Sequence, residues 1–407
     1  MNLLSSASIF SFFTLISRFL GYIRDILIAI FLGASIFADA FFVAFRLPNT
    51  FRRLFAEGTF NAAFIPSYTS AKLKNKNGGI KFADDVLSIL FLILVFIVTL
   101  AEIFTPFLVY LIAPGFVDDD VKFKLAVEFT RITFPFLLFV SLSSFFSGIL
   151  NSNNKFAAAA AAPIILNIIL ILSILFSYFQ NINVARQLSY GVTIAGIVQL
   201  IFLIYFSSKF YRPNFKLSFK IKKKIKFFFK KLLPSIFSSG VTQINILIGT
   251  IIASFQTGAV SYLYYADRVY QINLAIAGIA VGTVSLPILS KAYKTKNFLN
   301  ILNIQNKSIQ LSLLFSMPAS IGLIIASEEI VNGLFGYGSF TPEDVKMTSE
   351  ALMFFGFGII AFALLKVLAN FYFARDNTKT PFYITSFIVF LNVLISLSFF
   401  DSLGFII

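Results

Sequence analysis

Apolar runs longer than 20 residues recur along almost the whole chain, separated by segments rich in charged residues, Gly, Pro and Asn. A run of about 20 apolar residues crosses a bilayer as a helix, whereas a strand of a lipid-facing barrel needs only about ten. With 58% hydrophobic and 13% charged residues among 407, the chain has more apolar side chains than one globular core can bury. The sequence therefore predicts an all-α, polytopic membrane protein and excludes a soluble enzyme.

The runs predict about eleven transmembrane helices. They span residues 5–32, 35–70, 86–112, 125–150, 156–179, 187–209, 229–254, 258–290, 309–332, 347–374 and 381–405. The first run contains Arg18 and Arg24 and lacks both a basic leader segment and a small-residue cleavage site. It is therefore expected to belong to the mature protein and not to be a signal peptide.

Basic residues are distributed unequally between the loops. Loops after even-numbered helices contain 21 Lys and Arg residues, and loops after odd-numbered helices contain four. These four are Lys122, Lys124, Arg186 and Lys346. By the positive-inside rule, the N-terminus and the even-numbered loops are expected in the cytoplasm. The basic segment 220–231 could contact nucleic acid, but a cytoplasmic loop on anionic lipid is favoured, so no nucleic-acid partner is predicted.

The two halves of the chain resemble each other. Gly33-Ala34 recurs as Gly258-Ala259, Pro66 as Pro287, and Asn167 as Asn392. Parallel repeats are a transporter architecture in which the substrate site lies between the halves. We therefore expect a six-helix lobe at 1–215 and a five-helix lobe at 216–407. The lack of a twelfth helix indicates either a truncated sequence, which is favoured, or an unusually short member of its class.

Eight basic residues lie inside the predicted helices or at their edges, where each costs about 2.5–3.5 kcal/mol at mid-bilayer on insertion scales. They are Arg18, Arg24, Arg46, Arg52, Arg53, Arg131, Arg268 and Lys366. Five fall in the first two helices, which contain fewer acids, namely Asp25, Asp39 and Glu57. A further acid, Asp267, precedes Arg268. Since guanidinium binds phosphate bidentately, this surplus of arginine predicts a central cationic cavity for an anionic, phosphate-bearing substrate.

Helix geometry gives a finer interpretation of this cluster. Arg18 and Asp25 are seven residues apart and are expected to share one helix face. Pro48 is expected to break the second helix and to free backbone groups near Arg46, Asn49, Arg52 and Arg53. Alternatively, Arg52 and Arg53 extend toward the membrane interface, and Asp267 and Arg268 form a local structural pair. The interfacial interpretation is favoured for Arg131 and Lys366.

Two N-terminal segments carry a family resemblance. "SRFLGYIRDILIAIFLGAS" and "ADAFFVAFRLPNTFRRLFAEGTFNAAFIP" closely resemble the start of the MurJ (MviN) family of lipid II flippases, in the multidrug/oligosaccharidyl-lipid/polysaccharide (MOP) exporter superfamily. The similarity continues through "APGF", "ITFPFLLFVSLSSFFSGILN", "YYADRVYQ", "GTVSLPILSKAY" and "FARDNTKTP" over essentially the whole chain. Family members have fourteen transmembrane helices, so the resemblance implies that the last three are absent here.

The resemblance implies a transporter and not an enzyme. It implies that lipid II, the undecaprenyl-pyrophosphate-linked peptidoglycan precursor, moves from the cytoplasmic to the periplasmic leaflet of the bacterial inner membrane by alternating access. By motif, the pyrophosphate is assigned to Arg18, Arg24, Arg52 and Arg268. Coupling or gating is assigned to Asp39, with Asp25, Glu57 and Asp267 as further candidates. Arg46, Asn49 and Arg53 are additional candidates for lining the cavity. The expected partners are lipid II and membrane lipids around a monomer.

No cofactor or metal is predicted. The chain contains no cysteine or histidine, which excludes thiol nucleophiles and His-based metal or proton-relay sites. It contains no GxxxxGK[ST] motif, so membrane potential or an ion gradient, and not ATP, is the expected energy source. Three alternatives remain: an exporter of another lipid-linked glycan or a drug, an enzyme acting on polyprenyl phosphates, and a scaffold. Surplus arginine disfavours a cationic drug, and the enzyme's only acidic candidate, the run 118–120, is expected in a solvated periplasmic loop.

Overall fold

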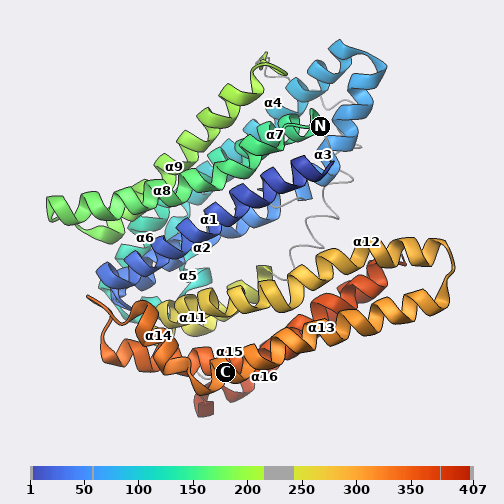
Figure 1. The fold of residues 1–407 in the computed structure, drawn as a ribbon. Helices are drawn as coiled ribbons and strands as arrows, with labels where there is room; N and C mark the ends of the chain where they lie inside the picture. Colours follow the sequence, from blue (N-terminus) through green and yellow to red (C-terminus); the bar gives the residue numbers. More distant parts are fainter. Residues whose placement is uncertain (1–2, 57–58, 215–242, 376, 404–407) are drawn as a thin grey trace. The chain divides into compact units, whose positions relative to one another are not determined.

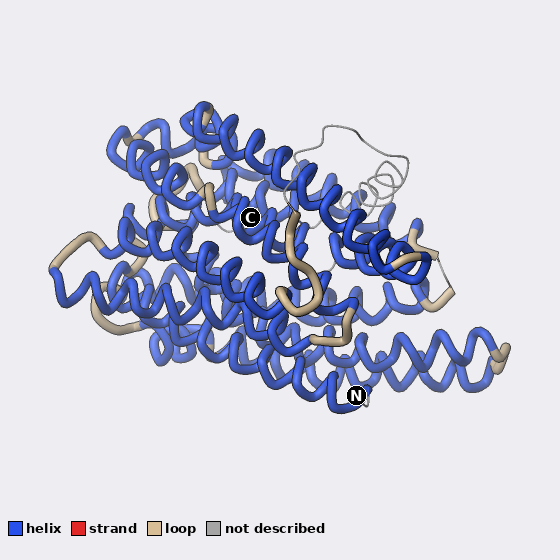
Figure 2. Tube along the Cα trace, turned by 90° about the horizontal axis from the view of Figure 1, so that it is seen from above, coloured by secondary structure: helices blue, strands red, loops and turns tan. Residues whose placement is uncertain are grey.

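The computed structural model describes residues 3–56, 59–214, 243–375 and 377–403. Within these ranges every regular element is helical, and Figure 2 shows helices joined by loops. The chain divides into two compact units: the first comprises Met1–Leu32 and Ile36–Phe255, and the second comprises Gly33–Ser35 and Gln256–Ile407. The predicted lobe boundary between 215 and 216 lies outside the described residues.

The first unit contains helices that pack side by side over most of their length (Figure 1). They are α1 (Leu3–Leu32), α2 (Ile36–Ala56), α3 (Thr59–Lys74), α4 (Lys76–Ile103), α5 (Thr105–Ile112), the 3-10 turn η1 (Pro114–Asp118), α6 (Asp120–Thr133), α7 (Phe136–Ser152), α8 (Phe156–Gln180), α9 (Val184–Ser207) and a short apolar helix, Gln243–Ala253. Helix α1 packs on α8, α8 on α9, and α2 on both α6 and α7. These contacts position the charged residues of α1 and α2 against α8 and α6.

The second unit is arranged around one long helix, α15. Its elements are α11 (Ala259–Leu274), the π-helical turn η2 (Ala275–Ala280), α12 (Val281–Lys294), α13 (Phe298–Ile325), α14 (Ser327–Phe335), α15 (Pro342–Phe373) and α16 (Lys379–Leu403). Helix α15 packs against α11, α12, α13 and α14. It begins with a capping box, in which Thr341 and Asp344 exchange side-chain to backbone hydrogen bonds.

Eight described helical segments are long and apolar enough to cross a membrane. They are Asn77–Ile103, Asp120–Ser152, Phe156–Gln180, Val184–Ser207, Ala259–Lys294, Phe298–Ile325, Pro342–Phe373 and Lys379–Ser396. They correspond to eight of the eleven predicted helices. The first prediction corresponds to α1, and the second to α2 and α3. Most of the seventh, 229–254, lies outside the described residues, which contain only its last part.

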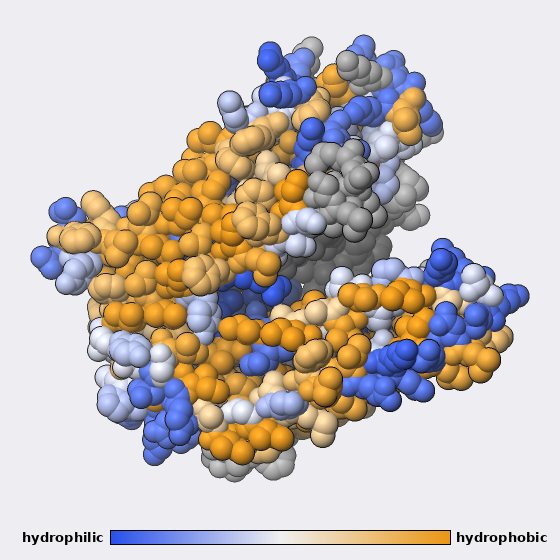
Figure 3. Space-filling view, viewed as in Figure 1, coloured by the Kyte–Doolittle hydropathy of each residue, from blue (hydrophilic) through white to orange (hydrophobic). Residues whose placement is uncertain are grey.

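Helices α8 and α9 present apolar side chains outward, visible as an orange band in Figure 3. Exposed residues of this band include Leu172, Phe176 and Phe179 on α8 and Ile201 and Tyr205 on α9. A soluble protein rarely exposes so continuous an apolar surface, whereas lipid tails are a compatible solvent for it. The band is therefore the surface expected of a bilayer-embedded helix pair.

Two glycines that the internal repeat pairs with each other share one backbone conformation. Gly33 has φ +59° before α2, and Gly258 has φ +79° at the N-cap of α11. Few residues other than glycine adopt this left-handed conformation without strain. The repeated Gly-Ala dipeptide thus marks the same turn before the corresponding helix of each half.

The chain leaving α9 is fixed to α4 by a buried tyrosine. The Tyr211 hydroxyl donates a hydrogen bond of 2.6 Å to Asp84 Oδ1, and the Asn214 amide donates to the same oxygen at 3.1 Å. Burial, together with the Asp84 carboxylate, raises the pKa of Tyr211 well above its ordinary value. Tyr211 therefore remains protonated and continues to act as the donor.

Close packing of α7 against α3 predicts one large effect on stability. A Cβ at Gly148 would lie 2.7 Å from Phe64 Cδ1 and 2.8 Å from Asn61 Oδ1, and Phe64 is fully buried. We expect Gly148→Val to lower the free energy of unfolding by about 1–3 kcal/mol, because the added methyls overpack this core. The measurement is denaturant unfolding of the purified protein in detergent, followed by circular dichroism. Gly333→Ala is the control, because its added Cβ meets no heavy atom within 4 Å apart from its chain neighbours and the adjacent backbone of its own helix; equal losses would contradict the prediction.

Candidate functional site

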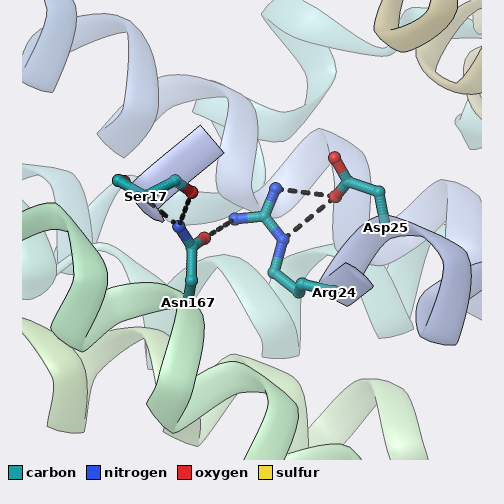
Figure 4. A network of polar contacts seen from close by, with 4 residues as sticks. All are labelled: Ser17, Arg24, Asp25 and Asn167. Carbon is teal, nitrogen blue, oxygen red and sulfur yellow. Dashed lines mark hydrogen bonds and ion pairs between the residues drawn. The ribbon is translucent and has the colours of Figure 1, made fainter. Parts of the chain in front are cut away.

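A polar network joins α1 to α8 (Figure 4). Arg24 donates to Asp25 Oδ1 from Nη2 at 2.6 Å and from Nε at 3.0 Å. Its Nη1 donates to Asn167 Oδ1 at 2.9 Å. The Asn167 amide nitrogen in turn donates to the Ser17 backbone carbonyl at 2.8 Å. The network fixes the plane of the Arg24 guanidinium and crosses the α1–α8 interface.

Burial explains why this network needs several partners. Arg24 is 8% exposed and Asp25 is 2% exposed. A buried charge is tolerated only when it is paired and its remaining hydrogen-bonding groups are satisfied. Asp25 supplies the opposite charge from the next residue, and Asn167 supplies an uncharged acceptor from α8. Gly21 lies against Asn167, since a Cβ there would be 3.5 Å from its amide nitrogen.

Arg18 differs from Arg24 in its environment. Its side chain is exposed, and it makes no hydrogen bond or ion pair with the residues that the structure describes. Asp25, seven residues further along α1, is buried and bound to Arg24. Arg18 and Asp25 therefore do not form one local ion pair, and Arg18 keeps its guanidinium exposed.

Asp39 forms a second buried ion pair. The Lys122 ammonium lies 2.6 Å from Asp39 Oδ2, with side-chain exposures of 4% and 0%. Asp39 lies in the first turn of α2 and Lys122 in the first turn of α6. The ammonium also lies 4.2 Å from the centre of the Phe116 ring, a distance typical of a cation–π contact.

Lys122 is a residue that the sequence analysis missed, because it was assigned to a loop. The acidic run at 118–120 is the origin of that error. Asp119 is exposed, but it caps α6, accepting hydrogen bonds from the amides of Val121 and Lys122 at 3.0 Å each. An aspartate ahead of an amphipathic segment is a helix start signal, and it would have placed Lys122 on a helix.

Helix α2 continues through Pro48, so the predicted break there is wrong. A proline inside a helix leaves the carbonyl four residues earlier without its normal donor. Here that carbonyl belongs to Ala44, and it accepts a hydrogen bond of 3.0 Å from the Thr133 hydroxyl of α6. A side chain of a neighbouring helix thus replaces the missing backbone donor, and the helix remains intact.

Helix α2 carries basic residues on both sides of Pro48. Arg46, Arg52 and Arg53 are all partly buried. Arg52 Nε donates to Asn49 Oδ1 at 3.0 Å, one turn earlier on the same helix. Asn49 thus orients Arg52. Glu57, the acid predicted to follow these residues, lies outside the described residues.

Asp267 and Arg268 lie on α11 in the second unit, and both are partly buried. Gln271, one turn further along, donates a hydrogen bond to Asp267. The Arg268 guanidinium lies 4.5 Å from the centre of the Tyr264 ring, one turn earlier. Each charge therefore contacts a neutral side chain of its own helix.

The charges of the first unit define what this site can bind. Among the described residues, α1 and α2 contain five arginines and two carboxylates, Asp25 and Asp39, and Lys122 of α6 adds a basic residue beside Asp39. Both carboxylates are used in buried pairs. No described group of three or more acidic side chains could hold a metal ion. The arrangement suits recognition of an anion by arginines and contains no constellation for covalent chemistry.

The helical spans and the charged residues buried among them define a polytopic membrane transporter. An inward-facing multidrug resistance MATE family transporter of the MOP superfamily shares this fold, with a TM-score of 0.68 and 13% identity over 92% of this chain and 84% of its own. A solved structure of lipid II flippase MurJ, in an inward closed conformation, is more similar. It has a TM-score of 0.87 and 30% identity, covering 98% of this chain and 82% of its own.

Sequence comparison assigns the family. The family model "Lipid II flippase MurJ" matches residues 28–407. A probable lipid II flippase MurJ of Rhizobium meliloti (strain 1021) is 41% identical over 96% of this chain and 74% of its own length. One of Rickettsia prowazekii (strain Madrid E) is 40% identical over 99% and 79%. The chain belongs to the lipid II flippase MurJ family, which confirms the predicted family, the all-helical polytopic fold and the transporter class.

The Arg24 network predicts a specific effect at Asn167. Asn167→Ala removes the uncharged acceptor of a buried guanidinium, and hydrogen bonds to charged groups contribute about 1.5–3 kcal/mol. We expect the free energy of unfolding to fall by that amount. Asn183→Ala is the control, because Asn183 caps α9 at an exposed position and its side chain accepts from the Arg186 amide, so about 1 kcal/mol is expected there. The measurement is denaturant unfolding in detergent, and a smaller effect at Asn167 than at Asn183 would contradict the role given to the network.

Proposed function

We propose that this protein moves lipid II from the cytoplasmic to the periplasmic leaflet of the bacterial inner membrane. The observation that carries the proposal is the family match over residues 28–407, supported by relatives about 40% identical over nearly the whole chain. Two features of the structure support the proposal, because the substrate has a lipid tail and a pyrophosphate. The exposed apolar band on α8 and α9 is compatible with a lipid environment, and the arginines of α1 and α2 suit the pyrophosphate.

The proposed mechanism is alternating access between two lobes, 1–215 and 216–407, in a monomer. Arg18, Arg24, Arg52 and Arg268 hold the pyrophosphate. Coupling and gating belong to Asp39, Asp25, Glu57 and Asp267, while Arg46, Asn49 and Arg53 line the cavity. No bond is made or broken, so the residues need only bind the head group in one state and release it in the other. The membrane potential, worth about 2.3 kcal/mol per charge per 100 mV, or an ion gradient supplies the energy.

The first test of this function is complementation. A strain depleted of its own lipid II flippase should resume growth when this gene is expressed, and a membrane-abundance blot checks that the protein is present. Lipid II exposed on the outer leaflet, measured with an impermeant enzyme that cleaves it, should rise in parallel. Growth without a rise in exposed lipid II would indicate another lipid-linked glycan as the substrate.

Within that test, the arginines should be required as arginines. Lysine keeps the charge but loses the planar fork that binds two phosphate oxygens. We expect Arg18→Lys to reduce lipid II exposure at least tenfold at unchanged abundance, because Arg18 is exposed and supports no buried network. Arg24→Lys should reduce exposure and stability together, because it also breaks the contacts to Asp25 and Asn167. Full activity of Arg18→Lys would show that Arg18 contributes only its positive charge and not the bidentate geometry of its guanidinium.

The proposed orientation has its own test. The chain has no cysteine, so single cysteines can be labelled without background. With the N-terminus in the cytoplasm, Asp118→Cys before α6 should react with a membrane-impermeant maleimide in intact spheroplasts. Lys155→Cys before α8 should react only after permeabilisation, because the positive-inside rule places it in the cytoplasm. Both positions are exposed, so the reverse labelling pattern would invert the topology.

A further inference from the structure

The Asp39–Lys122 pair joins two helices that are far apart in sequence. Asp39 and Lys122 are 83 residues apart, and their contact of 2.6 Å lies where the first turns of α2 and α6 meet. Both side chains are almost fully buried. Two opposite charges so placed stabilise each other, because removing one leaves the other buried without the counter-ion that it contacts at 2.6 Å.

Lys122 is held in place from three directions. Asp119 caps the helix that carries it, which fixes its backbone amide. The centre of the Phe116 ring lies 4.2 Å from the Lys122 ammonium, and the Asp39 carboxylate forms an ion pair with that ammonium. A flexible lysine with these constraints behaves as a fixed point charge directed at α2.

The same two helices are joined a second time further along. Thr133, at the end of α6, donates to the Ala44 carbonyl that Pro48 leaves without a donor. Two polar contacts at different levels fix both the rotation and the height of α2 against α6. Helix α2 is the element that carries Arg46, Arg52 and Arg53, so its rotation decides where these guanidinium groups point.

We propose that Lys122 is a positioning residue for transport, acting through Asp39, and that the ion pair is the functional unit. This inference rests on the proposed function. Asp39 serves as the counter-ion that holds α2 in register with α6, so that the arginines of α2 face the head group. On this account Asp39 is not itself a ligand of the substrate or of a coupling ion, and Lys122 is required as strictly as Asp39.

An exposed pair on the same helix provides a matched control. Lys124 and Asp120 are 4.0 Å apart, with side-chain exposures of 79% and 88%. Such surface pairs contribute little to stability. Lys124→Met therefore removes the same charge two residues away from Lys122, on the same turn of α6, without touching a buried partner.

The experiment compares five variants for lipid II exposure per folded molecule. They are Lys122→Met, Asp39→Asn, the double variant combining both, the charge reversal Asp39→Lys with Lys122→Asp, and the control Lys124→Met. Lys122→Met and Asp39→Asn should each lose at least tenfold. The neutral double variant should lose no more than either single change, and the reversal should recover at least threefold over the single changes. The control should match the wild type.

A second measurement separates this inference from the proposed function. Melting temperatures of the same purified variants give a double-mutant cycle that does not depend on lipid II. If the wild type fails to expose lipid II, the proposed function is wrong. Non-additive shifts in melting temperature would then still show that Asp39 and Lys122 interact.

The positioning role is overturned by either of two results. In the first, Lys122→Met transports like the wild type while Asp39→Asn does not, so that Asp39 acts alone. In the second, the losses of transport multiply in the neutral double variant, so that the two residues act independently.

Discussion

The cost of burying a charge or a free carbonyl without a partner is the constraint on which the packing of α1 and α2 depends. Water has little access to the interior of the packed helices, so a charge or a carbonyl freed by a proline is stabilised there by a partner in the protein. Three groups of α1 and α2 show the same solution: Arg24 binds Asp25 and Asn167, Asp39 binds Lys122, and the Ala44 carbonyl binds Thr133. In every case at least one partner comes from another helix. The polar contacts therefore determine which helices pack against each other. The apolar faces determine only that the helices lie in lipid.

The second unit joins two of its helices through small polar residues. Ser308, Ser312, Ser316 and Ser320 recur every four residues on α13, and all are buried. This spacing places them on one face, where small side chains allow a neighbouring helix to approach closely. Ser320 donates across the interface to the Gly356 carbonyl of α15 at 2.8 Å. Close packing of α13 on α15 thus depends on the absence of large side chains, and not on charge pairs.

Hydropathy alone predicted most of the fold. Eight of the predicted helices correspond to candidate spans because length and apolarity are properties of a single segment. The Arg24–Asp25 contact was not predicted, because neighbouring residues of a helix point about 100° apart, and the sequence placed Asp25 on one face with Arg18. The continuity of α2 through Pro48 and the partner of Asp39 could not be predicted, because each depends on a residue more than 80 positions away. The identity of a partner on another helix is a property of the packed structure, and one sequence gives no measure of it.

Lys122 changes the charge balance from which the substrate was inferred. If Lys122 is counted as a loop residue, the negative charge of Asp39 balances the positive charge of one arginine in the α1–α2 cluster. Placed in the helix bundle, it occupies Asp39 itself, as Arg24 occupies Asp25. Each of the two buried carboxylates thus contacts a basic partner, Arg24 or Lys122, and the guanidinium of Arg18 stays exposed. Lys122 adds one positive charge to the cluster that was counted from α1 and α2 alone. The larger positive charge strengthens the argument for an anionic head group.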